Sequence, residues 1–262
     1  MKVIILAAGM SSRLRPITSD KPKCMLKLFN ETLLERQIKI FRNYNINDIT
    51  IVTGYRSEVI DVSNVNYVKN ENYETTNINE SLFCALEPSN SPVLVTYSDI
   101  VFEPKIVQQM LEITNDIRLA VRINWKECYQ NRTMHPLFEA ENVLIENWRI
   151  LEIRKNISKS LENQQIGEFL GITLLSPDQI KILLERYSDL KKNHVGVFHS
   201  SPSLSNAYLT DMLQEMINCG ATVKPVFTEG KWCEIDTPED LRNAEKSLRT
   251  YTGPAKNERE KI

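Results

Sequence analysis

Residues 3–23 read VIILAAGMSSRLRPITSDKPK. The stretch opens with four apolar residues, 3–6, which is typical of a parallel strand that is buried on both faces. The small residues 7–9 follow at once and let the backbone come close to a ligand. Backbone N–H groups in such a turn can point at a phosphate, and Arg13 and Lys23 add positive charge nearby. The stretch therefore predicts a strand that ends in a nucleotide-binding loop.

Two other phosphate-binding motifs are absent from the sequence. A dinucleotide fingerprint needs G-x-G-x-x-G, and a P-loop needs G-x-x-x-x-G-K-[ST]. After Gly9 the next glycine is Gly54. Because those two motifs use glycines to bring the backbone close to phosphates, the sequence argues against a dehydrogenase or a P-loop kinase.

Composition sets broad limits on the function. The chain has 262 residues, of which 42% are hydrophobic, so it can bury the core of one large domain. Its net charge of −2 argues against a nucleic-acid groove, since such surfaces are usually basic. No apolar stretch approaches the ~18 residues of a membrane span. We expect a small-molecule partner, with neither nucleic acid nor membrane.

Cysteine usage indicates a reducing compartment. The five cysteines are odd in number, scattered, and form no C-x-x-C pair, which disfavours both a disulfide framework and a zinc site. The amino terminus reads as a core strand and lacks the pattern of a targeting segment. We therefore expect a cytoplasmic protein.

Strand and helix patterns alternate along the first half of the chain. Strands are expected at 3–6, 49–52, 65–68, 93–97 and 118–123, and helices at 33–41, 79–87, 104–114 and 176–187. This alternation predicts an α/β fold in which helices cover both faces of a mostly parallel sheet. Ligands of such sheets bind beyond the carboxyl ends of the strands.

The segment 124–175 interrupts the alternation and is expected to be a β-rich insertion. Two hairpin strands are expected within it, 137–145 and 148–155, followed by a polar loop over 156–165. The segment 188–203 has no periodicity and is expected to be an irregular surface loop. We expect one domain over 1–249 and a frayed tail over 250–262, where apolar residues are scarce.

The order of residues in the first loop resembles the signature of sugar-phosphate nucleotidyltransferases and of their phosphocholine and phosphonate cytidylyltransferase relatives. The matching positions are Leu6-Ala7-Ala8-Gly9, Arg13-Leu14, Pro16, Thr18 and Pro22-Lys23. The resemblance covers 1–249 and implies a Rossmann-related domain of the nucleotide-diphospho-sugar transferase type. It implies that the small residues lie under the base and ribose and that Arg13 and Lys23 hold phosphates. Ser11 stands where the family usually has a second glycine.

The same resemblance implies a magnesium site made by two distant carboxylates. Asp99 is the last residue of the apolar run 92–99, and Asp236 lies in the run KWCEIDTP of residues 231–238. Taken alone, each Asp could be a turn former or a helix cap. If Thr237 is the cap instead, the Asp236 carboxylate stays free for Mg²⁺, which prefers a few carboxylates plus substrate phosphates. Glu234 is a candidate to support this site or to contact the acceptor.

The base is expected to bind at the start of the helix near residue 79. Thr76 or Asn77 would cap that helix, and Ser81 follows within its first turn. Together with Ser98, these residues complete the expected nucleotide site. The segment resembles cytidylyltransferases and departs from the Gln-x-x-x-x-Gly pattern of enzymes that use sugar phosphates. CTP is therefore the expected nucleotide.

The acceptor side rests on fewer signals. Lys155 ends a strand where family members carry a basic residue for the acceptor phosphate, and Arg154 competes for that role on the opposite face. Glu168, Tyr208 and Asp211 are further acceptor candidates.

Aromatic residues offer a second interpretation of the acceptor side. Trp125, Tyr129, Trp148 and Trp232 could form a cage for a trimethylammonium group, or they could belong to the core. The histidines lack metal-site spacing, and the chemistry needs no histidine base; they are His135, His194 and His199.

Taken together, the residues and the resemblance predict transfer of CMP from CTP to a small phospho- or phosphono-compound, with release of pyrophosphate. The acceptor could be of the phosphocholine, aminoethylphosphonate or phosphorylated amino-acid type. The alternatives are a sugar-1-phosphate nucleotidylyltransferase and a catalytically silent nucleotide-sensing subunit. Retention of Arg13, Lys23, Asp99 and Asp236 argues against the silent subunit. A homodimer is one expected form of assembly.

Overall fold

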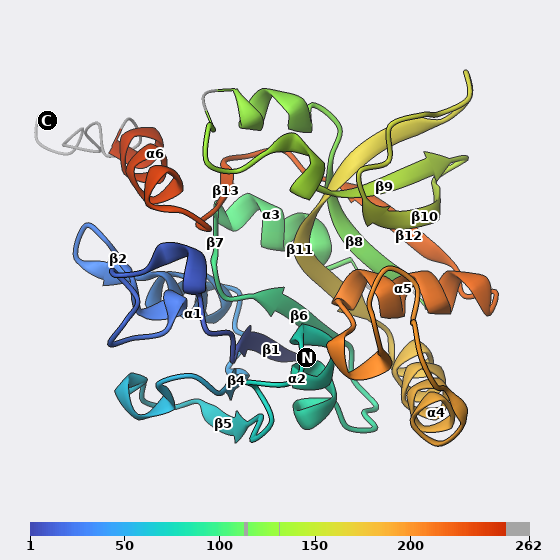
Figure 1. Ribbon diagram of the computed structural model, residues 1–262, viewed down its shortest axis with the longest axis horizontal. Coiled ribbons are helices and arrows are strands. Elements are labelled where there is room, and N and C mark those ends of the chain that lie inside the picture. The colour runs from blue at the N-terminus through green and yellow to red at the C-terminus, as the bar shows by residue number, and fades with distance from the viewer. Residues whose placement is uncertain (113–114, 131, 250–262) are drawn as a thin grey trace, which may run out of the picture.

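The computed structural model describes residues 1–112, 115–130 and 132–249. Its central feature is a nine-stranded sheet in which seven strands follow the order β10-β9-β11-β6-β1-β4-β5. Two further strands, β8 and β12, branch from this order because β8 pairs with β11 and β12 pairs with β8. Figure 1 shows this sheet between helices that come from both halves of the chain.

The first half of the chain builds the parallel core of the sheet. Strand β1 (Lys2–Ala7) pairs in parallel with β4 (Asp48–Thr53) and β6 (Val93–Tyr97), and β4 pairs in parallel with β5 (Asn66–Lys69). All residues of β1 after Lys2 are buried. This is why the strand reads as a continuous apolar run.

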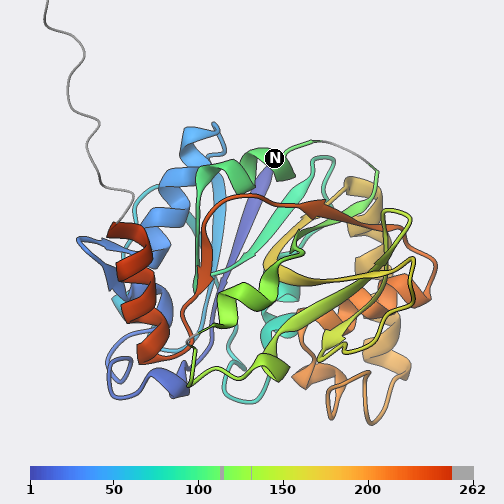
Figure 2. The same cartoon turned by 90° about the horizontal axis from the view of Figure 1, so that it is seen from above.

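Two apolar clusters hold the helices on opposite faces of the sheet. Ile4 and Leu6 pack in one cluster and Val3 and Ile5 in the other, as the alternation of a strand requires. The first cluster receives α2 (Ile78–Ala85), α4 (Pro177–Asn193) and α5 (Leu209–Asn218). The second receives α1 (Leu33–Asn43) and α3 (Pro104–Met110). Figure 2 shows these two groups on either side of the strands.

The second half adds antiparallel strands around β11 (Gln165–Leu175). One part of β11 pairs with β9 (Glu141–Glu146) and a later part with β6, while β8 (Ile117–Arg122) pairs along it. The remaining strands are β10 (Arg149–Lys155), antiparallel to β9, and β12 (Val223–Phe227), parallel to β8. The sheet is therefore mixed, with a parallel core.

A short ribbon returns the end of the chain to the sheet. Strand β7 (Ile100–Phe102) pairs antiparallel with β13 (Trp232–Glu234), which α6 (Pro238–Arg249) follows. The pairing continues one step further, because Ile235 N–H donates to the Asp99 carbonyl at 2.9 Å. Two short strands, β2 (Lys27–Leu28) and β3 (Glu31–Thr32), pair beside α1.

The structure confirms the α/β class, with helices on both faces of the sheet. The hairpin is also confirmed, although residues 137–139 form a 3-10 turn ahead of β9. The irregular loop expected over 188–203 is wrong in part: α4 continues to Asn193, and Phe198 is buried. The expected tail over 250–262 lies outside the described residues.

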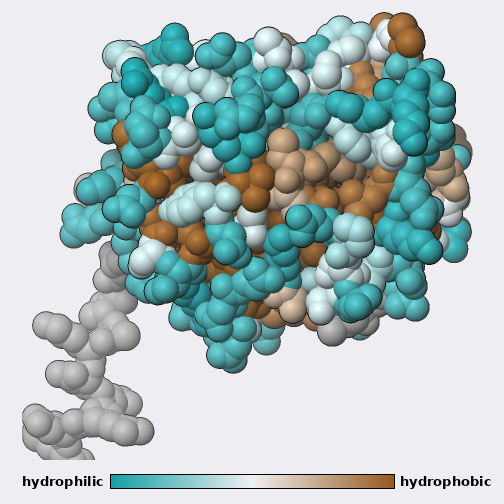
Figure 3. Space-filling view, turned by 90° about the horizontal axis from the view of Figure 1, so that it is seen from below, coloured by the Kyte–Doolittle hydropathy of each residue, from teal (hydrophilic) through white to brown (hydrophobic). Residues whose placement is uncertain are grey.

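One face of the molecule is mostly polar, which agrees with the burial of apolar side chains in the two clusters. On the face drawn in Figure 3, polar residues cover most of the surface, and apolar residues show mainly in a band across its middle. Within the described residues, no helix has the length and apolar character needed to cross a membrane.

The first prediction concerns Gly171, where the register of β11 against β8 shifts. Gly171 has φ +74°, and a Cβ there would lie 2.8 Å from Tyr97 Cδ2. Gly196 has φ +90°, but a Cβ there would meet nothing within 4 Å. Gly196→Ala should cost about 1–2 kcal/mol for the left-handed backbone alone. Gly171→Ala should cost about 1–3 kcal/mol more because of the steric clash. Denaturant unfolding measures both, and equal losses would contradict the role of the contact with Tyr97.

Candidate active site

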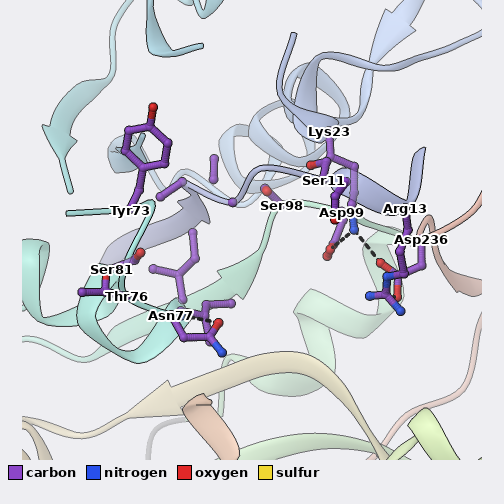
Figure 4. A pocket seen from close by; sticks show the side chains of 16 residues that line it. Ser11, Arg13, Lys23, Tyr73, Thr76, Asn77, Ser81, Ser98, Asp99 and Asp236 are labelled. Carbon is purple, nitrogen blue, oxygen red and sulfur yellow. Dashed lines mark hydrogen bonds and ion pairs between the residues drawn. The ribbon is translucent and has the colours of Figure 1, made fainter. Parts of the chain in front are cut away.

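A cavity of about 290 Å³ opens where β1 and β6 end. Figure 4 shows its lining, which comes from the first loop, from the start of α2 and from the end of β6. The structure brings together here every residue expected to bind nucleotide: Leu6, Ala7, Ala8, Gly9, Arg13, Lys23, Thr76, Asn77, Ser81 and Ser98. Both expected metal ligands, Asp99 and Asp236, line the same cavity. Ser11, Ser12, Tyr73 and Ile78 complete it.

The first loop keeps a glycine-like conformation without the second glycine. Ser11 has φ +53°, a left-handed value that glycine adopts most readily. Thr18 Oγ1 donates a hydrogen bond to the Ser11 carbonyl at 2.9 Å, and Tyr55 OH donates to the Ser19 carbonyl at 2.8 Å. These contacts stabilise the turn from outside, which explains how serine is tolerated there.

The start of α2 is held by a network of amides and hydroxyls. Asn77 is the N-cap: its Oδ1 accepts from Ile78 N–H at 2.8 Å, and its Nδ2 donates to the Asn206 carbonyl at 3.1 Å. Asn70 Nδ2 donates to Thr76 Oγ1 and to Ser81 Oγ, both at 3.0 Å. The Asn77 amide is thus used within the fold. Ser81 accepts from Asn70, which leaves its hydroxyl hydrogen for a ligand.

Lys23 joins the two distant carboxylates. Its Nζ lies 2.8 Å from Asp99 Oδ2 and 2.5 Å from Asp236 Oδ1, and Arg13 Nη2 lies 2.9 Å from Asp236 Oδ2. Burial by itself lowers the pKa of Lys23, but the two carboxylates outweigh burial and hold its pKa above the usual value. Burial by itself raises the pKa of Asp236, but Lys23 and Arg13 hold it below its usual value. Lys23 and Asp236 are therefore both charged at neutral pH.

The carboxylates are suited to a divalent cation. Asp99 Oδ1 is buried and, within the described residues, accepts no hydrogen bond. Asp236 ends the β7–β13 ribbon opposite Asp99, so the two side chains converge on one point from separate elements. A pair of carboxylates beside a cavity that can hold phosphates is the arrangement that Mg²⁺ favours.

Thr237 is the residue that caps α6. Its Oγ1 accepts from Asp240 N–H at 3.2 Å, and Asp240 Oδ2 accepts from the N–H groups of Thr237 and Asp236 at 2.9 and 3.1 Å. This is a capping box. Thr237 is thus the cap, as one of the two interpretations predicted, and the Asp236 carboxylate is not used by the cap but pairs with Lys23 and Arg13.

His135 is a site residue that the sequence analysis set aside. Its Nδ1 lies 3.4 Å from Asp236 Oδ2, and its Nε2 lies 3.8 Å from Glu234 Oε2. His135, Glu234 and Asp236 are close enough together to hold a metal ion. Burial and the nearby Arg132 lower the pKa of His135, which favours neutral imidazole. Burial, with Asp236 and Asp99, raises the pKa of Glu234. Sequence spacing could not reveal this neighbourhood because only the folded chain creates it.

The acceptor candidates separate into two groups. Lys155 Nζ lies 2.6 Å from Glu139 Oε2 and 4.8 Å from the centre of the Tyr208 ring, so Lys155 and Tyr208 are neighbours. Arg154 is exposed and pairs with Glu152, which leaves Lys155 as the better candidate. Glu168 and Glu234 line a second, smaller cavity.

Asp211 lines neither the nucleotide cavity nor the second cavity. Its carboxylate accepts hydrogen bonds from Ser200, Ser201 Oγ and Tyr208 N–H, and it is buried. These bonds hold the loop before α5, so we assign Asp211 to support of Tyr208 instead of contact with the acceptor.

The aromatic cage is not formed. Trp125, Tyr129 and Trp232 are buried, whereas Trp148 is 68% exposed and packs against Phe227. Trp125 and Tyr129 pack edge to face, and Trp232 Nε1 donates to the Leu170 carbonyl at 3.0 Å. Core packing accounts for Trp125, whereas Tyr129 and Trp232 are buried and also line the second cavity.

The second prediction concerns Asp240, whose Oδ1 accepts from Arg132 Nε at 2.7 Å. Asp240→Asn removes a buried charge that pairs with Arg132 and caps α6, so we expect a loss of about 3–5 kcal/mol. Glu245→Gln, a half-buried change on the same helix, should cost less than about 0.5 kcal/mol. Thermal unfolding compares the two variants, and similar melting temperatures would refute the role of Asp240.

Comparisons with known proteins agree with a nucleotide-binding site in the first cavity. The family model for the MobA-like NTP transferase domain matches residues 3–166. The CTP:phosphoglutamine cytidylyltransferase of Campylobacter jejuni is 28% identical over 92% of this chain and 98% of its own. The choline-phosphate cytidylyltransferase of Streptococcus pneumoniae is 35% identical over 39% of this chain and 47% of its own.

Solved structures share the fold. The CTP:phosphocholine cytidylyltransferase of Streptococcus pneumoniae superposes with a TM-score of 0.70 at 23% identity, covering 94% of this chain and 98% of the other. The inositol-1-phosphate CTP transferase of T. maritima gives 0.71 at 21% identity, covering 97% and 98%. At these identities the likeness speaks for the fold alone, and it confirms the nucleotide-diphospho-sugar transferase type of architecture.

Proposed function

The chain belongs to the family of MobA-like NTP transferase domains, and from this premise we propose that it transfers CMP from CTP to a small phosphorylated or phosphonate acceptor. The observation that carries the proposal is the meeting of Arg13, Lys23, Asp99 and Asp236 at one end of a nucleotide-sized cavity. The relatives that are named as cytidylyltransferases support the choice of CTP.

In the proposed reaction an acceptor oxygen attacks the α-phosphorus of CTP. A bond forms between that oxygen and phosphorus, and the bond to the bridging oxygen of pyrophosphate breaks. A phosphate monoester is already largely ionised at pH 7, so the chain need not supply a base. Catalysis then consists of positioning and of stabilising negative charge.

Each charged residue has a role in this scheme. Arg13 and Lys23 stabilise the triphosphate and the departing pyrophosphate, and Lys155 binds the acceptor phosphate. Asp99 and Asp236 would hold Mg²⁺, which supplies charge neutralisation at the reacting phosphate groups. In the described structure Lys23 holds these two carboxylates together, and on nucleotide binding it can exchange a carboxylate for a phosphate oxygen.

We propose further that the domain extends over 1–249, that the protein acts in the cytoplasm, and that neither nucleic acid nor a membrane is its partner. The net charge of −2 supports the last point. A homodimer is part of the same proposal, and light scattering at several concentrations would test it. Pyrophosphate release with glucose-1-phosphate would test the alternative of a sugar-1-phosphate enzyme.

The third prediction tests the two carboxylates. Asp99→Asn and Asp236→Asn should each lower kcat by at least about 10³-fold, because each would remove a ligand whose charge acts in the transition state. Asp178→Asn, an exposed change in the first turn of α4, should leave kcat within about twofold. Pyrophosphate release at saturating Mg²⁺ and CTP measures all three. Turnover of either site variant within threefold of wild type would exclude that residue as a ligand.

The fourth prediction tests the nucleotide. Cytosine presents an amine donor and two ring acceptors, and a site that pairs with one edge leaves polar groups unpaired with the wrong base. We expect kcat/KM for CTP to exceed that for UTP by about 10²-fold. Ser81→Ala should reduce this ratio, whereas Thr75→Ala, an exposed neighbour outside the cavity lining, should preserve it. Equal kcat/KM values for CTP and UTP in the wild-type protein would reject cytidylyl transfer and leave nucleotidyl transfer.

A further inference from the structure

A second cavity lies directly beside the metal-binding carboxylates. It is lined by Tyr97 and Glu234, which precede Asp99 and Asp236 by two residues, and by three carboxylates from the insertion and β11. These three are Glu139, Glu141 and Glu168. Its volume is about 20 Å³, which is room for roughly one water-sized group. We refer to it as the acidic cavity.

Glu168 presents an unused acceptor in the acidic cavity. Tyr129 OH donates to its Oε1 at 2.5 Å, while Oε2 is buried and has no hydrogen-bond partner among the described residues. The Glu168 side chain is only 2% exposed. Burying a carboxylate oxygen without a donor costs about 1–3 kcal/mol of folding free energy or more. A ligand that donates a hydrogen bond to this oxygen gains binding free energy correspondingly.

Among the described residues, only some of the carboxylates that line the acidic cavity have a cationic partner. Glu139 is paired with Lys155 at 2.6 Å, and Glu234 lies 3.9 Å from Arg132. Within the described part of the chain, Glu141 and Glu168 form no ion pair. Glu141 accepts only from neutral hydroxyls, Tyr97 OH at 3.2 Å and Thr210 Oγ1 at 3.4 Å.

Burial raises the pKa of Glu141 and of Glu168 to about 7. Each group is therefore only partly ionised at neutral pH. A cation that binds between them favours the ionised form of both, because an opposite charge at short range lowers the pKa of a carboxyl. Against the effect of burial, Lys155 lowers the pKa of Glu141, and Arg132 and Arg122 lower that of Glu168. Among the described residues, however, none of these cations forms an ion pair with the two carboxylates. A ligand that brings a cation to short range therefore matches them.

On the basis of the proposed function, we infer that the acidic cavity binds a primary ammonium group of the acceptor. A primary ammonium has three N–H donors and no acceptor, which complements Glu168 Oε2 and the Glu141 carboxylate. It also has about the size of the water molecule that the cavity can hold. A trimethylammonium group donates no hydrogen bond, and its three methyl groups make it larger than the one water-sized group for which the cavity has room. The acceptor is therefore a compact amino phosphate or amino phosphonate, and choline phosphate is a poor substrate.

Three acceptors that differ only at the cationic end test the inference: O-phosphoethanolamine, phosphocholine and 2-hydroxyethyl phosphate. At saturating CTP and Mg²⁺, kcat/KM for O-phosphoethanolamine should exceed both others by at least about tenfold, since the site would leave carboxylates unpaired with them. Glu168→Gln keeps an oxygen for Tyr129 but removes the charge. It should reduce the preference for the amine over the hydroxyl analogue to within about threefold, and Glu185→Gln, an exposed change on α4, should preserve it.

The outcomes separate the two proposals. If no acceptor yields CMP transfer, the proposed function fails. If transfer occurs and the three acceptors react equally, the inference is overturned and the function stands. An amine preference that survives in Glu168→Gln would overturn the assignment to this cavity. CTP binding by calorimetry shows whether that variant is folded, and Tyr129→Phe, which leaves the Glu168 charge but removes its donor, gives an independent variant that should weaken the preference.

Discussion

The ion pairs of Lys23 with Asp99 and Asp236 are the interaction on which the site depends. The ribbon of β7 and β13 brings these carboxylates to one point, where their mutual repulsion in a buried setting would be costly. A buried ammonium 2.8 and 2.5 Å away offsets that repulsion. The same two carboxylates suit a phosphate-bound cation. The ion pairs that stabilise this part of the fold therefore also prepare the site for a triphosphate.

The two cavities on either side of this centre have opposite chemical character. The nucleotide cavity is lined by small residues, hydroxyls and the cations Arg13 and Lys23. The acidic cavity is lined by carboxylates, among them Glu141 and Glu168, and by aromatic and aliphatic side chains, but, in the part of the chain that the structure describes, by no cation. Anionic phosphates and a cationic head group would therefore be drawn to different sides of Asp99. This separation orients a zwitterionic acceptor with its phosphate toward the nucleotide.

The register shift of β11 lies at the lining of the second cavity, which includes Phe169 and Gly171. Gly171 shifts the register of β11, so that one strand pairs with β9 near Glu168 and with β6 beyond the shift. Tyr97 packs against Gly171, where a Cβ would not fit. Strand β11 thereby joins β9 to the central sheet and brings Glu141 and Glu168 beside the parallel core.

The sequence alone determined whatever depends on neighbours along the chain: the first strand and its loop, a helix start at Thr76 or Asn77, and the carboxylates at two strand ends. Through its resemblance to a family, the sequence also predicted that Asp99 and Asp236 lie at one metal site. Only the tertiary structure showed that His135 lies beside Asp236 and that most of the aromatic cage candidates are buried. It alone also showed the hydrogen bond from Tyr129 to Glu168. Local patterns record backbone preference and burial, whereas contacts between distant segments depend on register and packing that no short stretch encodes.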